Sequence, residues 1–174
     1  MSLFDEDKTL NSILYLSQKA ADGLDLYALV KMIYFADKAH LHQWGRTITG
    51  NSYARMEHGP TPSEAYDMLK SARDEGDWRW DLKKYFAIER NNKVVPKRGP
   101  DMSVFSASEV EILDMIYKEN AGKTFDQLKR KAHDKAYRSS KVLWMTYEDM
   151  AEGDAALIEH IRKSREDNQV LDRC

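Results

Sequence analysis

The sequence contains almost no cysteine, which limits its covalent and metal chemistry. One of the 174 residues is cysteine, Cys174. A disulfide within the chain is therefore impossible, and no cysteine cluster is present for zinc or an iron–sulfur centre. The histidines do not follow the spacing of a zinc finger or of an H-E-x-x-H motif; they are His40, His42, His58, His133 and His160. We expect no metal ion and no other cofactor.

Long hydrophobic runs are also missing. No apolar segment approaches the ~20 residues that a membrane-spanning helix needs. The start of the chain, M-S-L-F-D-E-D-K, has acids in place of the apolar segment of a signal peptide. The length suits one domain, since domains commonly have ~100–150 residues. We expect a cytoplasmic protein without a membrane partner, with one domain over residues 1–166 and a polar tail over residues 167–174.

Neither sign of charge is in large excess. The 27 Lys and Arg residues are interspersed with 29 Asp and Glu residues, for a net charge of −2. Nucleic-acid-binding proteins usually carry a basic stripe, because phosphate contacts supply most of their affinity. One segment keeps DNA binding open as an alternative. A Gly-containing turn at 121–124 is followed, as in a helix-turn-helix, by basic residues; these are Lys129, Arg130, Lys131, Lys135 and Arg138.

Signatures of common enzymes are absent. The segment from Gly45 to Gly50 has two glycines but lacks the Lys-Ser/Thr pair of a phosphate-binding loop. The G-x-S-x-G motif of α/β-hydrolases does not occur. We therefore expect a protein that is not an enzyme. An enzyme that uses Asp37, His40 or His58 is the remaining catalytic alternative.

Helical periodicity dominates what is present. Apolar spacing predicts helices over residues 7–21, 25–44, 107–120, 124–135 and 154–166, and another that begins at Pro62. Capping boxes mark three helix starts: Thr61 with Glu64, Ser106 with Glu109, and Thr124 with Gln127. Two β-prone runs on either side of residues 91–92 predict a small hairpin. The predicted fold is mainly α, a compact single-domain helical bundle with a small β-hairpin.

Two polar residues lie on the apolar stripe of the helix predicted over residues 25–44. Asp37 and His40 are three residues apart, so a helix places them on the same face. A carboxylate that orients an imidazole would serve as a general base. Alternatively, the two side chains anchor Arg46 or the backbone N–H groups of the turn that follows. Because no nucleophile is apparent nearby, we favour the structural interpretation.

Two segments have the composition of a binding surface. His58, Gly59 and Pro60 form a corner before a predicted helix start. The corner either only positions that helix start or binds an anion or a partner's carboxylate with the free N–H groups of the helix. Further along, basic residues alternate with aromatic ones, which either bind a partner or cover the core; the residues in question are Trp78, Arg79, Trp80 and Tyr85. We predict that these seven residues contact a partner.

The region from Lys31 to Pro62 resembles the Panacea domain of SocA-like antitoxins, a family also described as phage-associated proteins. The resemblance rests on a K-x-x-Y-F-A-D segment, a G-x-x-I-x-x-x-x-Y-x-A stretch and a G-P-x-P turn. The matching residues are Lys31, Tyr34, Phe35, Ala36, Asp37, Gly45, Ile48, Tyr53, Ala54, Gly59, Pro60 and Pro62. Leu128, His133 and Trp144 fit a weaker Leu, His, Trp pattern near the end of such domains.

This resemblance implies a structural motif and a function. The motif residues are Tyr34, Asp37, His40, Tyr53, Pro62, His133 and Trp144. The implied function is that of an antitoxin, which neutralises a cognate protein toxin encoded beside it. Such a protein either covers the toxin directly or delivers it to a cytosolic protease. The chain departs from the family pattern in its G-P-T-P turn, where G-P-V-P is commoner, and in the aromatic segment around Trp78.

Overall fold

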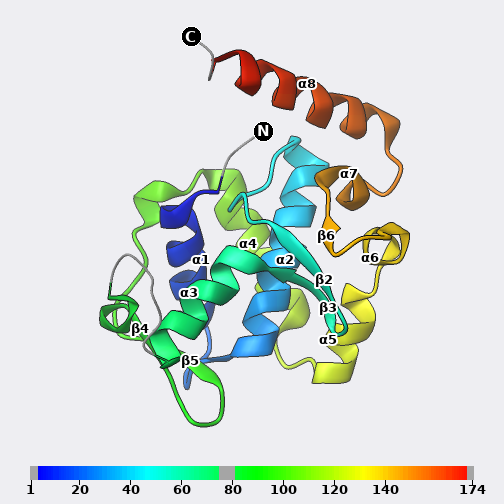
Figure 1. Cartoon of the computed structure of the whole chain (residues 1–174). Helices are drawn as coiled ribbons and strands as arrows, with labels where there is room; N and C mark the ends of the chain where they lie inside the picture. The colour runs from blue at the N-terminus through cyan, green and yellow to red at the C-terminus, as the bar shows by residue number, and fades with distance from the viewer. Residues whose placement is uncertain (1–3, 75–80, 172–174) are drawn as a thin grey trace.

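The computed structural model describes residues 4–74 and 81–171, which form eight α-helices, two 3₁₀ turns (Leu82–Lys84 and Met102–Val104) and six short strands. The mainly α prediction is confirmed. Helices α1 (Glu6–Gln18), α2 (Leu26–Trp44) and α4 (Ala107–Asn120) pack against one another (Figure 1). None of the helices within the described residues is long and apolar enough to cross a membrane.

Helix α2 lies at the centre of the structure. Twelve of its 19 residues are buried, on all sides of the helix. Burial on all sides is typical of a helix in a core position, and α2 indeed contacts α1, α4 and both small sheets. Its ends lie within one residue of the prediction. The Asp25 carboxylate accepts a hydrogen bond from the Ala28 N–H at 3.0 Å, and Gly45 closes the helix in the left-handed conformation at φ 72°.

Two antiparallel three-stranded sheets flank the helices. The first has the order β1-β5-β4, from β1 (Leu24–Asp25), β5 (Lys93–Pro96) and β4 (Phe86–Ile88). Strands β4 and β5 form the predicted hairpin. The second sheet has the order β3-β2-β6, from β3 (Gly59–Pro62), β2 (Tyr53–Met56) and β6 (Trp144–Met145), and was not predicted. Its central hairpin, β2–β3, turns at residues 57–58.

The helix predicted to begin at Pro62 is present as α3, but it begins one residue later and without the predicted capping box. Thr61 and Pro62 belong to β3, and α3 spans Ser63–Asp74. Glu64 does not close a capping box on Thr61, because its carboxylate accepts hydrogen bonds from the Ser52 N–H and hydroxyl at 2.7 and 2.8 Å. The prolines fit β3 because it is an edge strand, where a missing N–H is tolerated. The other two capping boxes, Ser106 with Glu109 and Thr124 with Gln127, are present as predicted.

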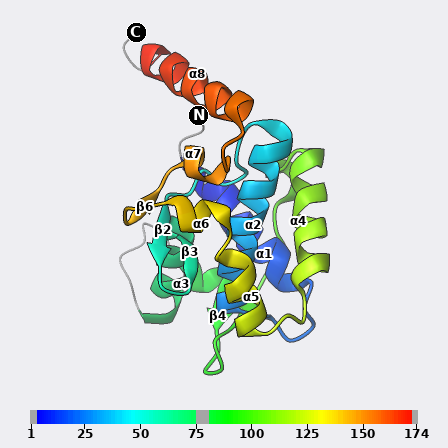
Figure 2. The same ribbon diagram turned by 90° about the vertical axis from the view of Figure 1, so that its right-hand side faces the viewer.

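The C-terminal part differs from the prediction in two places. The helix predicted over residues 124–135 is divided into α5 (Phe125–Ala132) and α6 (Lys135–Ser139). After the short α7 (Tyr147–Met150), helix α8 runs over Ala155–Leu171, so it continues past the predicted helix end at residue 166. Figure 2 shows α8 projecting beyond α7, at the end of the molecule where α2 terminates. Leu157 and Ile161 of α8 are buried.

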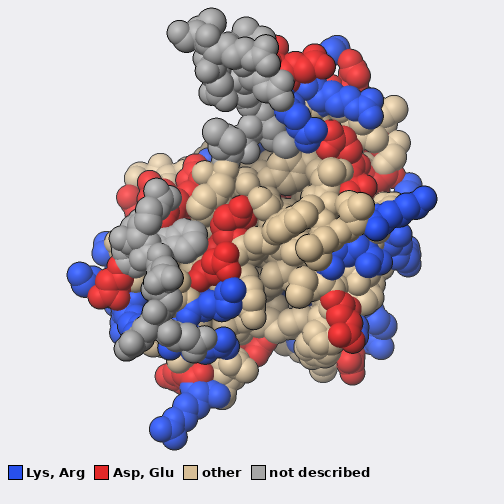
Figure 3. Space-filling view, viewed as in Figure 1, with Lys and Arg blue, Asp and Glu red and all other residues tan. Residues whose placement is uncertain are grey.

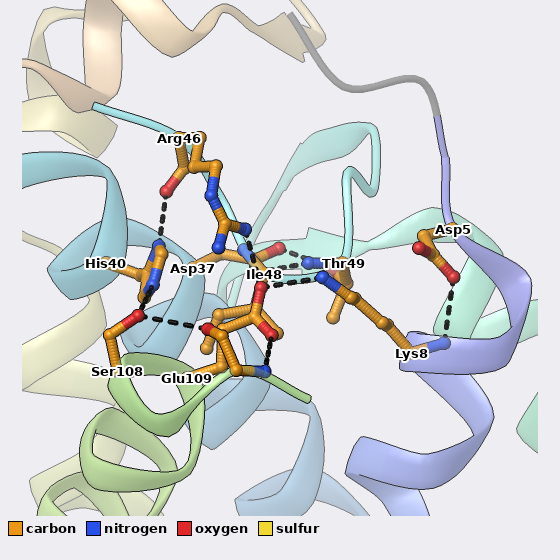
Figure 4. Close-up of polar contacts among 10 residues, drawn as sticks. Asp5, Lys8, Asp37, His40, Arg46, Ile48, Thr49, Ser108 and Glu109 are labelled. Atoms are coloured by element: carbon orange, nitrogen blue, oxygen red, sulfur yellow. Dashed lines mark hydrogen bonds and ion pairs between the residues drawn. The ribbon is translucent and has the colours of Figure 1, made fainter. Parts of the chain in front are cut away.

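A buried carboxylate joins α4 to α1 and to the loop after α2. Glu109 has no exposed surface, and its Oε1 accepts hydrogen bonds from Lys8 Nζ at 2.7 Å and from Arg46 Nη1 at 2.5 Å (Figure 4). Burial raises the pKa of Glu109, but the hydrogen bonds from Lys8 and Arg46 outweigh it. The net pKa therefore lies below the ordinary value of 4.5.

Replacing this carboxylate should give an acid-sensitive loss of stability. We expect Glu109→Gln to lower the free energy of unfolding at pH 7 by about 1–3 kcal/mol, because a buried charged acceptor is lost. Because the pKa of Glu109 in the folded protein is lowered, the carboxylate contributes its full stabilisation above pH 4.5. The difference in free energy of unfolding between wild type and variant should then disappear as the pH falls through the folded pKa. Urea denaturation between pH 7 and pH 3 measures the difference. Glu111→Gln, at an exposed position of the same helix, is the control; a pH-independent gap between wild type and Glu109→Gln would contradict the prediction.

Candidate partner-binding site

Asp37 holds the loop that leads from α2 to β2. Its carboxylate accepts hydrogen bonds from the Ile48 N–H at 2.8 Å, the Thr49 N–H at 2.9 Å and the Tyr53 hydroxyl at 2.6 Å. The Thr49 hydroxyl donates a fourth hydrogen bond. Asp37 has no exposed surface, and Figure 4 shows it facing the loop segment of Ile48 and Thr49. The four donors fix the path of the chain into the β2–β3 hairpin.

His40 binds partners different from those of Asp37. Its Nδ1 lies 2.7 Å from the Arg46 carbonyl oxygen and its Nε2 lies 3.1 Å from the Ser108 hydroxyl (Figure 4). Because a carbonyl only accepts, we assign the proton of the neutral ring to Nδ1. Burial lowers the pKa of His40 and favours this neutral form. His40 therefore anchors the turn that follows α2 through the Arg46 carbonyl. Asp37 and His40 form no hydrogen bond with each other, so they are not arranged as a catalytic pair.

Burial also sets the protonation of the Asp37 site. It raises the pKa of Tyr53 well above the ordinary value, so the phenol keeps its proton and donates to Asp37. Burial raises the pKa of Asp37, while the hydrogen bonds from Thr49, Tyr53 and Ile48 lower it; the net shift is upward. Neither Asp37 nor His40 has any exposed surface.

Four side chains bind the backbone of the β2–β3 hairpin near its turn. They come from α2, from α6 and from the residue after α5, and each donates to a hairpin carbonyl. The donor–acceptor pairs are Tyr27 Oη to His58 O (2.8 Å), Lys31 Nζ to Pro60 O (2.6 Å), His133 Nε2 to Glu57 O (3.0 Å) and Tyr137 Oη to Met56 O (2.9 Å). These bonds fix the hairpin against the helices on both sides of its turn.

Lys31 is the unusual member of this group. Its side chain is buried, with 1% of the residue exposed, and its Nζ lies 5.2 Å from the centre of the Tyr27 ring. Among the residues that the structure describes, no carboxylate forms an ion pair with it. Burial therefore lowers the pKa of Lys31 to about 7.

A pocket of about 610 Å³ opens between the start of α2, the hairpin and α3. We call it the hairpin pocket. Its lining is mostly apolar; it includes Leu26, Tyr27, Val30, Lys31, Ala54, Met56, His58, Tyr66, Lys70 and Trp144. The size falls within the range of pockets that bind small ligands or anchoring side chains.

Large exposed apolar side chains surround the hairpin pocket. Met56 and Trp144 line it and are 50% and 53% exposed. Phe125 is 45% exposed, and its ring centre lies 4.4 Å from that of Tyr27 and 5.2 Å from that of His58. Leu143, next to Trp144 in the chain, is also exposed. Figure 3 shows uncharged side chains over this face, with charged ones around them; such a patch is typical of an interaction surface.

The predicted contact residues are divided between several places. His58 lines the hairpin pocket, whereas Gly59 and Pro60 are buried in β3 and do not line it. Tyr85 packs beside the first sheet, where the Arg98 guanidinium lies 5.0 Å from its ring centre. Trp78, Arg79 and Trp80 lie outside the described residues.

Sequence reasoning missed part of this surface. It placed Trp144 in the structural motif, whereas the structure exposes it at the pocket. Met56, Phe125, Val142 and Leu143 were not singled out, although all four are exposed. The run from Val142 to Trp144 was the available signal, but three apolar residues in succession are equally typical of a buried strand.

Residues 29–137, more than half of the 174, match the family described as antitoxin SocA-like, Panacea domain. The chain belongs to this family. No curated protein and no solved structure matches it. The matched Panacea domain contains Asp37, His40 and three of the four side chains that bind the hairpin, while Tyr27 precedes it and Trp144 and α8 follow it in the chain.

Two of the basic residues that suggested a helix-turn-helix, Lys131 and Lys135, bind other residues of the same protein. Lys131 forms an ion pair with Glu119 at 3.2 Å and lies 4.6 Å from the Phe35 ring centre. Lys135 donates a hydrogen bond to the Glu152 carbonyl. Because α5 ends at Ala132, Lys135 and Arg138 belong to a separate helix. The basic cluster therefore does not lie on one recognition helix.

We expect loss of the Asp37 carboxylate to destabilise the Panacea domain strongly. Asp37→Ala leaves four buried donors without their acceptor and should lower the free energy of unfolding by about 3 kcal/mol. Tyr53→Phe removes one donor and keeps the ring, so it should cost about 1 kcal/mol. Because the two residues share a hydrogen bond, the double variant should lose less than the sum. Equal costs for the single variants in denaturant unfolding would refute this account.

A second prediction concerns the close packing of the hairpin on α5. Gly59 has φ 100°, and a Cβ added there would lie 2.8 Å from the Ala132 Cβ. Gly122 has φ 78°, but a Cβ there would meet nothing within 4 Å. Both Gly→Ala changes strain the backbone, and Gly59→Ala also overlaps a side chain that cannot rotate away. Gly59→Ala should therefore lose at least about 1 kcal/mol more than Gly122→Ala. Thermal unfolding compares the pair, and equal midpoints would show that the contact with Ala132 is loose.

Proposed function

We propose that this protein is the antitoxin of a bacterial or prophage toxin–antitoxin pair, acts in the cytoplasm and is not an enzyme. The observation that carries the proposal is membership of the SocA-like Panacea family. An antitoxin of this kind neutralises a cognate protein toxin, so it needs a surface for another protein.

The hairpin pocket and the side chains around it are the surface that we assign to the toxin. Protein interfaces are enriched in Trp, Tyr, Phe and Met at their centre, and here Met56, Phe125 and Trp144 are exposed around one pocket. The hydrogen bonds from Tyr27, Lys31, His133 and Tyr137 hold the hairpin in place. A surface fixed before binding loses little conformational entropy on association.

Two mechanisms are consistent with binding at this surface. The antitoxin either covers the active surface of the toxin or delivers the toxin to a cytosolic protease. The amount of toxin in rescued cells separates them, because direct covering leaves it unchanged and delivery lowers it.

A growth assay tests the proposed function. The reading frame adjacent to this gene is induced alone and then together with this protein, and surviving colonies are counted. Killing by the neighbour and rescue by this protein are the expected results. A toxic neighbour that this protein does not rescue would overturn the antitoxin proposal for that pair.

Trp144 and Trp44 form a matched pair for mapping the interface. They are 53% and 56% exposed, but Trp44 lies at the opposite end of α2, about 25 Å from Tyr27 by helix rise. We expect Trp144→Ala to weaken toxin binding more than tenfold, since buried interface Trp residues commonly contribute at least ~2 kcal/mol. Trp44→Ala should bind as wild type does. Calorimetric titration measures both, and equal effects of the two changes would place the interface elsewhere.

A further inference from the structure

The hairpin pocket combines an apolar lining with one buried cation. Lys31 lines it, and the only hydrogen bond that its ammonium group donates among the described residues goes to the Pro60 carbonyl. An ammonium group carries three N–H donors, so the geometry leaves two of them without a hydrogen-bonded acceptor. A buried cation is stable only when a counter-charge or a set of acceptors surrounds it.

The acidic residues near the pocket do not supply this counter-charge. Asp67 lines the pocket, but its carboxylate pairs with Lys70 at 2.8 Å. Glu57 also lines the pocket, and its side chain is exposed at the turn. The pocket therefore offers a positive charge inside an apolar wall.

We propose that the hairpin pocket binds an acidic side chain of the toxin, an Asp or Glu with apolar neighbours, whose carboxylate pairs with Lys31. The proposal rests on the proposed antitoxin function and adds the chemistry of the bound group. The carboxylate would supply the acceptor that Lys31 lacks, while the neighbouring apolar side chains would pack on Met56, Phe125 and Trp144. Charge complementarity thus selects the occupant, and the apolar surface adds contact area.

Blocked tripeptides test the pocket without the toxin. The first probe is acetyl-Leu-Glu-Leu-amide, and its neutral control is acetyl-Leu-Gln-Leu-amide. Titration into ¹⁵N-labelled protein, followed by amide shifts of the hairpin, gives each dissociation constant. We expect the Glu peptide to bind roughly tenfold or more tightly than the Gln peptide, as a charged hydrogen bond predicts. Equal affinities would overturn the proposal.

A third probe separates two sources of a carboxylate. Acetyl-Leu-Gln-Leu with a free C-terminal carboxylate carries the charge at the chain end and not on a side chain. It should bind no more tightly than the Gln amide. If it binds more tightly than the Glu peptide, the pocket is a site for a chain terminus and the side-chain assignment is wrong.

Variants at Lys31 connect the effect to this residue. Lys31→Met should abolish the preference for Glu over Gln, whereas Lys31→Arg, which keeps the charge, should retain it. The spectrum of each variant without peptide reports whether the hairpin remains folded. A folded Lys31→Met protein that keeps the preference would overturn the proposal. The tripeptide result does not depend on the growth assay, so either can fail without the other.

The ionisation of Lys31 gives a readout that a purely structural lysine would not show. Burial lowers its pKa to about 7 in the free protein, and a bound carboxylate should raise it. Other titratable or charged groups face the site from α2, the hairpin, α3 and the end of α5; they are Tyr27, Glu57, His58, Asp67, Lys70 and His133.

We therefore expect the affinity for the Glu peptide to fall roughly tenfold between pH 6 and pH 8, as the free lysine loses its proton. His58→Gln removes the nearby imidazole and should leave this dependence in place. The ¹³Cε resonance of Lys31 reports its pKa directly. A Lys31 pKa that saturating Glu peptide does not change would contradict the proposed ion pair.

Discussion

The fold depends on satisfying polar groups that α2 carries into the core. Asp37, His40 and Lys31 have almost no exposed surface, and each forms a hydrogen bond with backbone in the loop after α2 or in the β2–β3 hairpin. Removing such groups from water costs more than the helix alone can compensate, so each needs a partner in the folded chain. The loop and the hairpin provide these partners, and the position of the hairpin pocket follows from that requirement.

The same constraint explains why Asp37 and His40 are better described as structural residues than as catalytic ones. A general base needs a substrate within hydrogen-bonding reach. Here the Asp37 carboxylate accepts four hydrogen bonds from Ile48, Thr49 and Tyr53. The His40 imidazole forms hydrogen bonds with Arg46 and Ser108. The sequence placed Asp37 and His40 on a buried stripe, which indicated that they fix the local geometry. The structure shows that they hold the loop of Arg46, Ile48 and Thr49.

Local features were predictable from sequence, and long-range pairing was not. The bounds of α2 and α4 and the β4–β5 hairpin depend on residues close in the chain. The second sheet depends on β6, two residues that pair with β2 across about 90 residues of chain. Strand β3 was missed because Thr61 and Pro62 have the pattern of a helix start, and only the pairing with β2 shows that they belong to a strand. The exposure of Trp144 could not be predicted either, because the same apolar run fits a buried strand.

Strand β6 has a consequence for how such a protein diversifies. It lies beyond the matched Panacea domain, yet it completes the second sheet and brings Trp144 to the pocket. The parts that hold the hairpin and the part that contributes this exposed ring are therefore encoded in separate stretches of the gene. Mutation of residues 141–144 can therefore change the exposed surface beside the pocket while the contacts that hold the hairpin in place stay intact.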